Sequence, residues 1–316
     1  MASLFLDSNV SDATRRERLY GGDIFVLSPS AASTRLCNFC RHLIEESFAP
    51  HDPLTAQYKL PVDEYVGAAG PLKTRLAHHP EAQRLLRETL AETGCDLGET
   101  YYDVPKLRVV TSGEYLSAGV GYPLHVHRDT WYSAPMSQLN WWMPLYPIES
   151  ESSMAVFSKY WHTAVANDSS KFNYYDWNRE RKTATKLTGK DNRFQPHPQE
   201  PIEMEPHLRI VCQPGGLIVF SGAQLHATIP NTSGRTRFSI DFRTVHIGDL
   251  EAGRAAQNVD SSPQGTSLRD FMRGTDRAHL PSTVVARYED AAATRGHEND
   301  LVYTPEESGE EKLSPR

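Results

Sequence analysis

Two histidines and one aspartate have the types and spacing of a metal site. His127 and Asp129 are separated by one residue, so on an extended strand both side chains project from the same face. His226 lies far downstream, just after an apolar run. Two imidazoles and one carboxylate on one face of a metal leave three coordination positions open, as in non-haem Fe(II) oxygenases. We therefore predict that His127, Asp129 and His226 are the metal ligands and the catalytic centre.

The segment after His226 predicts an anion site. Alternation along a strand over residues 236–245 places Arg237 and Ser239 on one face and large apolar residues on the other. A buried guanidinium is costly without a partner, so this pair requires an anion. The distal carboxylate of 2-oxoglutarate would fit. If the strand register differs, Arg235 is the alternative anchor.

These residues resemble the Fe(II)/2-oxoglutarate-dependent oxygenases, and within them the phytanoyl-CoA dioxygenase-like branch. The resemblance rests on the His-Arg-Asp motif at 127–129, on the distal His226 and on the arginine eleven residues later. It extends from about Ile24 to Val245. Residues 153–162 stand where that branch has a segment containing Gly and Pro, and both are missing here.

The resemblance implies a metal centre in which His127, Asp129 and His226 bind Fe(II), while Arg237 and Ser239 bind 2-oxoglutarate. With O2, the cosubstrate would be decarboxylated to succinate and CO2 as a small-molecule substrate is oxidised. We expect hydroxylation, with desaturation or cyclisation as alternative outcomes, and a place in secondary metabolism. The acid at position 129 argues against a halogenase, because chloride would have no vacated site.

A second reading of the same histidines is a cupin-type metal-binding protein that uses no 2-oxoglutarate. His125 and His127 form the His-x-His pattern of cupins, but no Glu follows before Glu149. We therefore expect His125 to support the site or to lie in the core.

Aromatic residues are concentrated around the predicted metal site. All five tryptophans lie between Trp131 and Trp177. The strand after the His-x-Asp motif turns polar residues to one face, where we expect contacts with 2-oxoglutarate from Gln138 and Asn140. The residues expected to bind substrate are Trp131, Tyr132, Trp142 and Arg108, the last of these with Lys106 as a carboxylate anchor.

The order of predicted elements favours an α+β, mainly β fold with a double-stranded β-helix (jelly-roll) core and flanking N-terminal and C-terminal helices. A strand at 23–27 precedes helices that start at Ser28-Pro29 and near Pro80, with a loop expected over 50–72. Short strands are expected at 107–111, 138–145, 154–157, 208–213, 216–220 and 236–245. Helices are expected again at 267–272 and 281–289.

Three parts of the chain are expected: a jelly-roll oxygenase domain with N-terminal helices (1–250), a helical extension packed on it (251–295) and an acidic disordered tail (296–316). The formal charge of −7 arises largely in that tail, which holds six acidic and two basic residues. The nearly neutral remainder argues against nucleic-acid binding.

The remaining expectations concern loops, thiols and partners. Residues 166–206 form a polar insertion with basic residues over 179–193, for which we consider a mobile lid beside a plain solvated loop. Four cysteines, including the Cys37–Cys40 pair, are expected to be thiols. We expect a cytoplasmic monomer or homodimer that acts on a small molecule, without a membrane or nucleic-acid partner.

Overall fold

The computed structural model describes residues 2–116, 119–121, 125–184 and 193–289, without the side chains of 181–184. Its helices are α1 (Asp12–Tyr20), α2 (Ala31–Phe48), α3 (Val62–His78), α4 (Pro80–Glu92), α5 (Tyr174–Ala184), α6 (Ile247–Ala252) and α7 (Ser282–Val285). Its strands are β1 (Leu4–Leu6), β2 (Ile24–Leu27), β3 (Thr100–Tyr102), β4 (Lys106–Val110), β5 (Leu139–Pro144), β6 (Met154–Val156), β7 (Leu208–Arg209), β8 (Leu217–Ser221), β9 (His226–Thr228), β10 (Arg237–His246) and β11 (Met272–Arg273).

Two sheets form the core of the protein. The larger has the order β1-β2-β8-β5-β10-β3-β11, with β4 also paired to β10, and the smaller has the order β7-β6-β9. Strand β10 is the longest and pairs with β5 along one edge and with β4 and then β3 along the other. The predicted α+β class with a jelly-roll core is confirmed.

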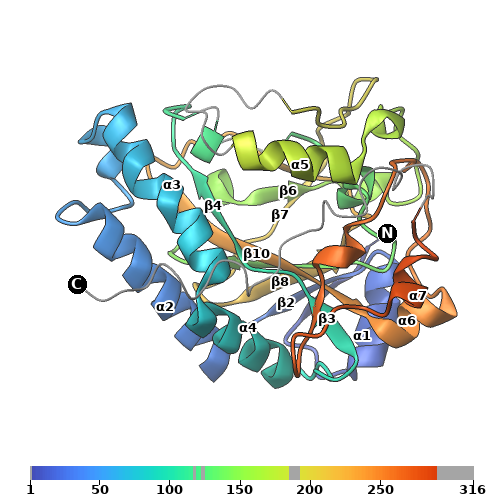
Figure 1. The fold of residues 1–316 in the computed structure, drawn as a ribbon. Helices are drawn as coiled ribbons and strands as arrows, with labels where there is room; N and C mark the ends of the chain where they lie inside the picture. Colours follow the sequence, from blue (N-terminus) through green and yellow to red (C-terminus); the bar gives the residue numbers. More distant parts are fainter. Residues whose placement is uncertain (1, 117–118, 122–124, 185–192, 290–316) are drawn as a thin grey trace.

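One face of the large sheet is covered by α2, α3 and α4 (Figure 1). Alternate residues of β10, namely Phe238, Ile240 and Phe242, point toward these helices and are fully buried. The intervening residues of β10 are polar or charged and lie on the opposite, inner face. This alternation assigns the helices to the outer face of the large sheet and leaves the inner face for chemistry.

The loop predicted over residues 50–72 is wrong from residue 62 onward, because α3 begins at Val62. Tyr65, Ala69, Leu72 and Leu76 recur at helical spacing and are buried against α2 and α4. Pro71 lies inside this helix, on its exposed side. Packing of the apolar face therefore outweighs the backbone hydrogen bond that a proline removes.

Other predictions differ in extent. The strand expected over 208–213 is limited to β7, and helices expected over 267–272 and 281–289 are a 3-10 turn (Ser267–Asp270) and the single turn α7. The polar insertion contains α5. Helix α1 and strands β1, β3, β9 and β11 were not predicted, since each is short.

The chain after β10 forms a strap (residues 247–289) that packs on the rest of the fold. At its start, the buried carboxylate of Asp249 accepts hydrogen bonds from Arg16 (2.6 Å), Arg254 (2.8 Å) and Tyr20 (2.9 Å). The strap is thereby joined to α1. The division near residue 250 stays a prediction, and the acidic tail of 296–316 lies outside the described residues.

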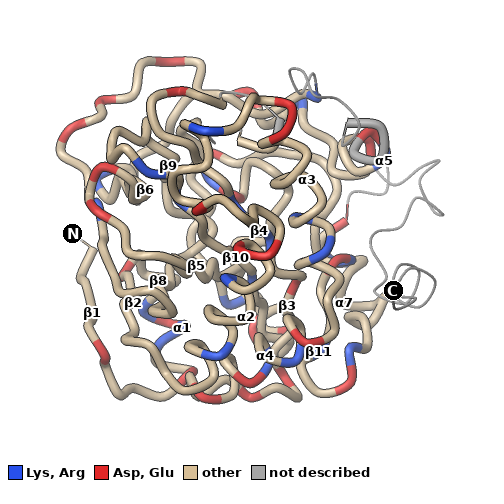
Figure 2. Tube along the Cα trace, turned by 90° about the vertical axis from the view of Figure 1, so that its left-hand side faces the viewer, with Lys and Arg blue, Asp and Glu red and all other residues tan. Residues whose placement is uncertain are grey.

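Charged residues of both signs are interspersed along the described chain (Figure 2). No described helix has an apolar stretch long enough to cross a bilayer.

Packing of α4 in the main core can be tested with a cavity-forming substitution. Leu86 is fully buried in the main core, so we expect Leu86→Ala to lower the free energy of unfolding by about 2–5 kcal/mol. Arg84→Ala on the exposed side of the same helix should cost about 1 kcal/mol or less. Urea unfolding of both variants measures the difference, and equal losses would contradict this packing.

Candidate active site

The predicted metal ligands are brought together by a two-residue bridge of main chain. The amide of His127 donates to the carbonyl of His226, and the amide of His226 donates back to the carbonyl of His127, each at 2.9 Å. Residues 99 positions apart thus become direct neighbours. Asp129 is fixed beside them because its amide donates to the carbonyl of Gly222 (2.9 Å).

Each imidazole is oriented by a main-chain carbonyl. Nδ1 of His127 lies 2.6 Å from the carbonyl oxygen of His125, and Nδ1 of His226 lies 2.9 Å from that of Gln224. A carbonyl can only accept, so the proton sits on Nδ1 and the lone pair of each Nε2 is free. These Nε2 atoms lie 3.4 Å and 3.7 Å from Oδ1 of Asp129. The three ligand atoms all lie within 4.8 Å of one another, a group that could hold a metal ion.

The protonation states suit a cation. Burial, together with His127, lowers the pKa of His226 to about 4, so its imidazole is neutral at pH 7. Burial by itself would raise the pKa of Asp129, but the contact with His127 and the charge of Arg243 hold it well below the usual value. Neutral imidazoles and an ionised carboxylate are the forms that bind metal.

The second oxygen of Asp129 is occupied by protein groups. Gln138 Nε2 donates to Oδ2 at 3.0 Å and also to the Asn140 side-chain oxygen at 2.9 Å, while Arg243 Nε lies 3.6 Å from Oδ2. Oδ1 alone therefore faces the two imidazoles. Gln138 and Asn140 do lie beside the triad, but Gln138 contacts a ligand of the metal site directly, a role that was not predicted.

Arg237 and Ser239 lie on the inner face of β10, as alternation predicted, and both are buried. Arg237 donates one hydrogen bond, to the carbonyl of Ser152 (3.1 Å), and its guanidinium lies 5.6 Å from the Trp142 ring. Its Nε and the Ser239 hydroxyl have no hydrogen-bond partner among the described residues. Burial, with Arg108 nearby, lowers the pKa of Arg237 to about 10. These unsatisfied donors fit an incoming carboxylate. The alternative anchor, Arg235, is exposed.

The aromatic residues predicted to bind substrate differ in position. Tyr132 is half-buried with its ring 5.5 Å from that of His127, as expected of a pocket wall. Trp142 shares the inner face of β5 with Asn140 and is nearly fully buried, beneath Arg237. Trp131 has no exposed surface and its indole donates to Asp260 (2.8 Å). The assignment of Trp131 to the substrate pocket is therefore wrong.

A row of ion pairs crosses the inner face beside the triad. We call it the inner ion row; it consists of Asp103, Lys106, Arg108, Asp241 and Arg243. Arg108 forms a bidentate ion pair with Asp241 (2.5 Å and 3.1 Å), and Lys106 pairs with Asp103 (2.6 Å). Arg243 contacts Asp103 (3.3 Å) and Asp241 (3.2 Å). Arg108 is thus paired within the protein, and its contact with substrate stays a prediction.

The sequence pattern of β10 predicts the positions of two members of the inner ion row. The alternation that placed Arg237 and Ser239 on one face also places Asp241 and Arg243 there. Arg243 was recognised only as sharing that face, and its contact with Asp129 was missed. Asp103 lies in a turn before β4 and carried no periodic signal.

His125 supports the site, as expected. Its ring stacks on His197 (3.8 Å between centroids) and its Nε2 lies 2.6 Å from the carbonyl of Pro196. It is not part of the group of potential metal ligands, which does not favour the cupin reading.

In the insertion, Arg179 pairs with Asp176, and Arg193 lies over the Trp177 ring. The loop lysines of the lid hypothesis, Lys186 and Lys190, lie outside the described residues.

The His-x-Asp segment is clamped from behind by Asp260 of the strap. Oδ2 of Asp260 accepts from Arg128 Nε and from the amide of Val165, both at 3.0 Å, while Oδ1 accepts from Trp131. Arg128, 1% exposed, also donates to three main-chain carbonyls. One carboxylate therefore holds the residues on both sides of Asp129.

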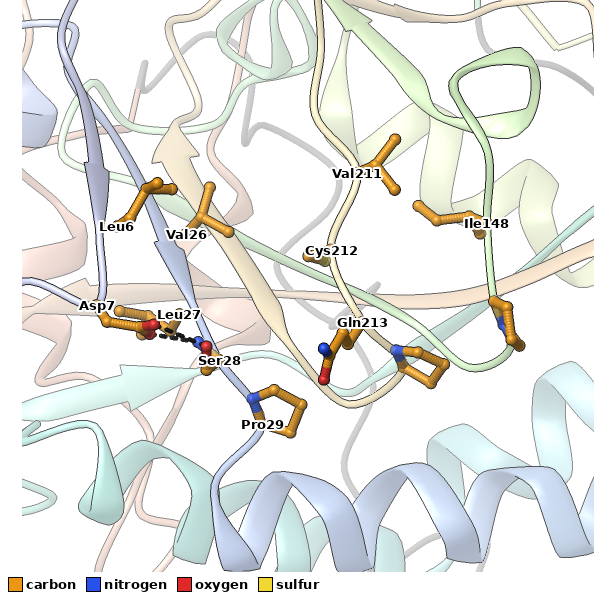
Figure 3. A pocket seen from close by; sticks show the side chains of 12 residues that line it. Leu6, Asp7, Val26, Leu27, Ser28, Pro29, Ile148, Val211, Cys212 and Gln213 are labelled. Atoms are coloured by element: carbon orange, nitrogen blue, oxygen red, sulfur yellow. Dashed lines mark hydrogen bonds between the residues drawn. The ribbon is translucent and has the colours of Figure 1, made fainter.

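A hollow of about 580 Å³ lies elsewhere, at the β1 edge of the large sheet (Figure 3). Leu6, Val26 and Val211 are among its lining residues, and Asp7 there accepts hydrogen bonds from the amide and hydroxyl of Ser28. It contains none of the predicted site residues, so we assign it no part in the chemistry.

Comparison with known families agrees with this geometry. The model of the phytanoyl-CoA dioxygenase (PhyH) family matches residues 26–239, about two thirds of the chain, and this region includes the triad and both predicted anchors of the cosubstrate. The chain belongs to the phytanoyl-CoA dioxygenase family. It is accordingly an enzyme of the non-haem iron, 2-oxoglutarate-dependent oxygenase type, with Fe(II), 2-oxoglutarate and O2 as its cofactor and cosubstrates.

Solved structures similar to this member of the phytanoyl-CoA dioxygenase family are distant in sequence. The apo non-heme monooxygenase ThoJ has 14% identity and a TM-score of 0.40, with 85% of this chain and 89% of that chain covered. EvdO2 from Micromonospora carbonacea var. aurantiaca, complexed with 2-oxoglutarate, has 13% identity and a TM-score of 0.43, with 75% and 92% covered. No protein with a curated description matches the sequence.

The Asp260 clamp generates a prediction for this family member. Asp260→Ala leaves the buried Arg128 without its carboxylate, so we expect the free energy of unfolding to fall by about 3–5 kcal/mol. Divalent metal affinity should also weaken, because Asp129 loses the support of its neighbours. Calorimetric metal titration and urea unfolding measure the two effects. Asp63→Ala, an exposed aspartate of α3, is the matched control, and an equally small effect of both substitutions would disprove the clamp.

Proposed function

We propose that this chain is an Fe(II)- and 2-oxoglutarate-dependent dioxygenase that hydroxylates a small-molecule substrate. His127, Asp129 and His226 bind the metal through Nε2, Oδ1 and Nε2. One observation carries the proposal: an Asp and two His that could hold a metal share the inner face with a buried arginine and serine, and the Nε of this arginine and the hydroxyl of this serine have no partner among the described residues. When bound, Fe(II) would supply the oxidative decarboxylation of 2-oxoglutarate by O2 to succinate and CO2, coupled to oxidation of the substrate.

The residues around the triad have distinct tasks in this proposal. Arg237 and Ser239 bind the distal carboxylate of 2-oxoglutarate, and Trp142 covers the guanidinium. Gln138 and Arg243 hold Oδ2 of Asp129, which leaves Oδ1 for the metal, and Asn140 fixes the Gln138 amide. Tyr132, next to His127, forms a wall for substrate.

The setting is also part of the proposal. The four cysteines are free thiols, which suits a cytoplasmic protein. We propose a monomer or homodimer, active in secondary metabolism, with the division into oxygenase domain, extension and tail at residues 250 and 295.

Cosubstrate binding can be tested without knowing the substrate. Anaerobic addition of Fe(II) and 2-oxoglutarate should produce a visible charge-transfer absorption that His127→Ala abolishes. Arg237→Ala should weaken 2-oxoglutarate binding at least tenfold, since each charge-assisted hydrogen bond contributes about 1.5–3 kcal/mol. Arg235→Ala, an exposed arginine two residues away, is the matched control. A protein that shows no such absorption and releases no succinate would refute the proposed function.

The free-energy cost of burying Arg237 without a carboxylate partner among the described residues gives an independent prediction. Without 2-oxoglutarate, Arg237→Met should leave the free energy of unfolding unchanged or raise it by about 1 kcal/mol, because it removes a buried cation that has no carboxylate partner. Added 2-oxoglutarate and Mn(II) should raise the melting temperature of the wild type well above that of the variant. A variant that is less stable by about 2 kcal/mol would assign Arg237 a structural role instead.

A further inference from the structure

The inner ion row extends from the triad, and the two cations farthest from Asp129 along its chain of contacts are its most exposed side chains. The side chain of Asp129 is 10% exposed and that of Arg243 15%, whereas Arg108 is 31% and Lys106 35% exposed. The row is continuous, because Arg243 contacts Asp129, Asp103 and Asp241, and these two aspartates pair with Lys106 and Arg108. Its outer end therefore has two partly exposed cations, each paired with an aspartate, on the face that carries the triad.

The strand register places these cations close to the cosubstrate anchors. Arg108 lies directly opposite Ser239, and Lys106 lies opposite Asp241, in the antiparallel pairing of β4 with β10. Directly opposite residues share a face of the sheet. A molecule that contacts Arg108 and Lys106 would thus lie beside the 2-oxoglutarate site and not within it.

A further cation, Lys73 of α3, adds to this region. Its ammonium group donates to the carbonyl of Val120 (2.6 Å) and has no carboxylate partner among the residues described. Burial, with repulsion from Arg108, lowers the pKa of Lys73 to about 8. Asp241 is the carboxylate that partly offsets this repulsion.

The charges around the triad do not balance. Among the described residues, five cations, Lys73, Lys106, Arg108, Arg237 and Arg243, accompany three carboxylates, Asp103, Asp129 and Asp241. Fe(II) and the 2-oxoglutarate dianion would add equal and opposite charges. An excess of two positive charges thus remains with the cofactor and cosubstrate bound, and clustered like charges favour a ligand of opposite sign.

We propose that the oxidised substrate is a small anionic molecule, bearing a carboxylate or a phosphate, whose charged group binds Lys106 and Arg108 at the outer end of the inner ion row. The inference rests on the proposed function for the identity of the neighbouring site. It adds the class of substrate and the residues that select it. Binding there places the rest of the molecule between these cations and the triad.

The test compares acids with their neutral analogues. Wild-type protein is loaded with Mn(II) and saturated with 2-oxoglutarate, so that the cosubstrate site is filled and no turnover occurs. Calorimetry then measures binding of small carboxylic acids, of their matched primary amides and of inorganic phosphate. We expect the acids or phosphate to bind at least tenfold more tightly than the amides.

Variants assign the anion to its site. Lys106→Met should weaken anion binding at least tenfold while the affinity for 2-oxoglutarate changes less than twofold, and Lys106→Arg should restore it. Asp103 keeps Arg243 as a partner in the Met variant, so folding is expected to survive. Lys59→Met, at an exposed lysine, is the control of equal charge change.

A failure of this inference can be distinguished from a failure of the proposed function. Equal binding of acids and amides, no binding of any anion, or equal effects of Lys106→Met and Lys59→Met would overturn the inference. If 2-oxoglutarate itself fails to bind, the proposed function fails, and the same acid and amide comparison on metal-free protein still decides the inference. Carboxylates and phosphate, tested separately, show which anion the row prefers.

Discussion

The reciprocal pair of hydrogen bonds between the main chains of His127 and His226 is the constraint on which the site depends. One of these residues precedes β5 and the other begins β9, and their segments also meet where the amide of Asp129 donates to the carbonyl of Gly222. Because the bridge is made by main-chain groups, it leaves both imidazoles free. Carbonyls two residues before each histidine then set the tautomers. The proximity of the three proposed metal ligands is thus a consequence of main-chain pairing.

Buried charge is the second theme of the fold. The inner face of β10 carries Arg237, Asp241 and Arg243 where the outer face carries Phe238, Ile240 and Phe242. Most of these charges are matched by neighbours at hydrogen-bond distance, which offsets the cost of removing them from water. Arg237 is the exception, because its buried Nε has no hydrogen-bond partner among the described residues. This unsatisfied donor lowers the stability of the fold and is available to bind a ligand.

The sequence pointed to the proposed metal triad and to the proposed cosubstrate anchors because each follows from local spacing. One residue between His127 and Asp129, and alternation after Arg237, are short-range patterns that survive in the structure. The sequence also indicated the main strands and two N-terminal helices.

Helix α3 was missed because Pro71 and neighbouring glycines suggest a loop, whereas its apolar face is stabilised by α2 and α4. Trp131 was misassigned since adjacency to Asp129 in sequence says nothing about which side of the segment it faces. Asp260 had no signal at all, because a contact between residues 128 and 260 depends on the path of the strap.

That strap has a consequence for how the protein is made. The family match ends at residue 239, yet the carboxylate that holds Arg128 and Trp131 comes from residue 260. During synthesis, the ligand segment emerges from the ribosome more than 130 residues before its clamp. The nascent chain can pair its strands, but it completes the support of Asp129 only when the strap has followed. Shortened forms that stop at the family boundary would carry every ligand and still lack the part that holds them in place.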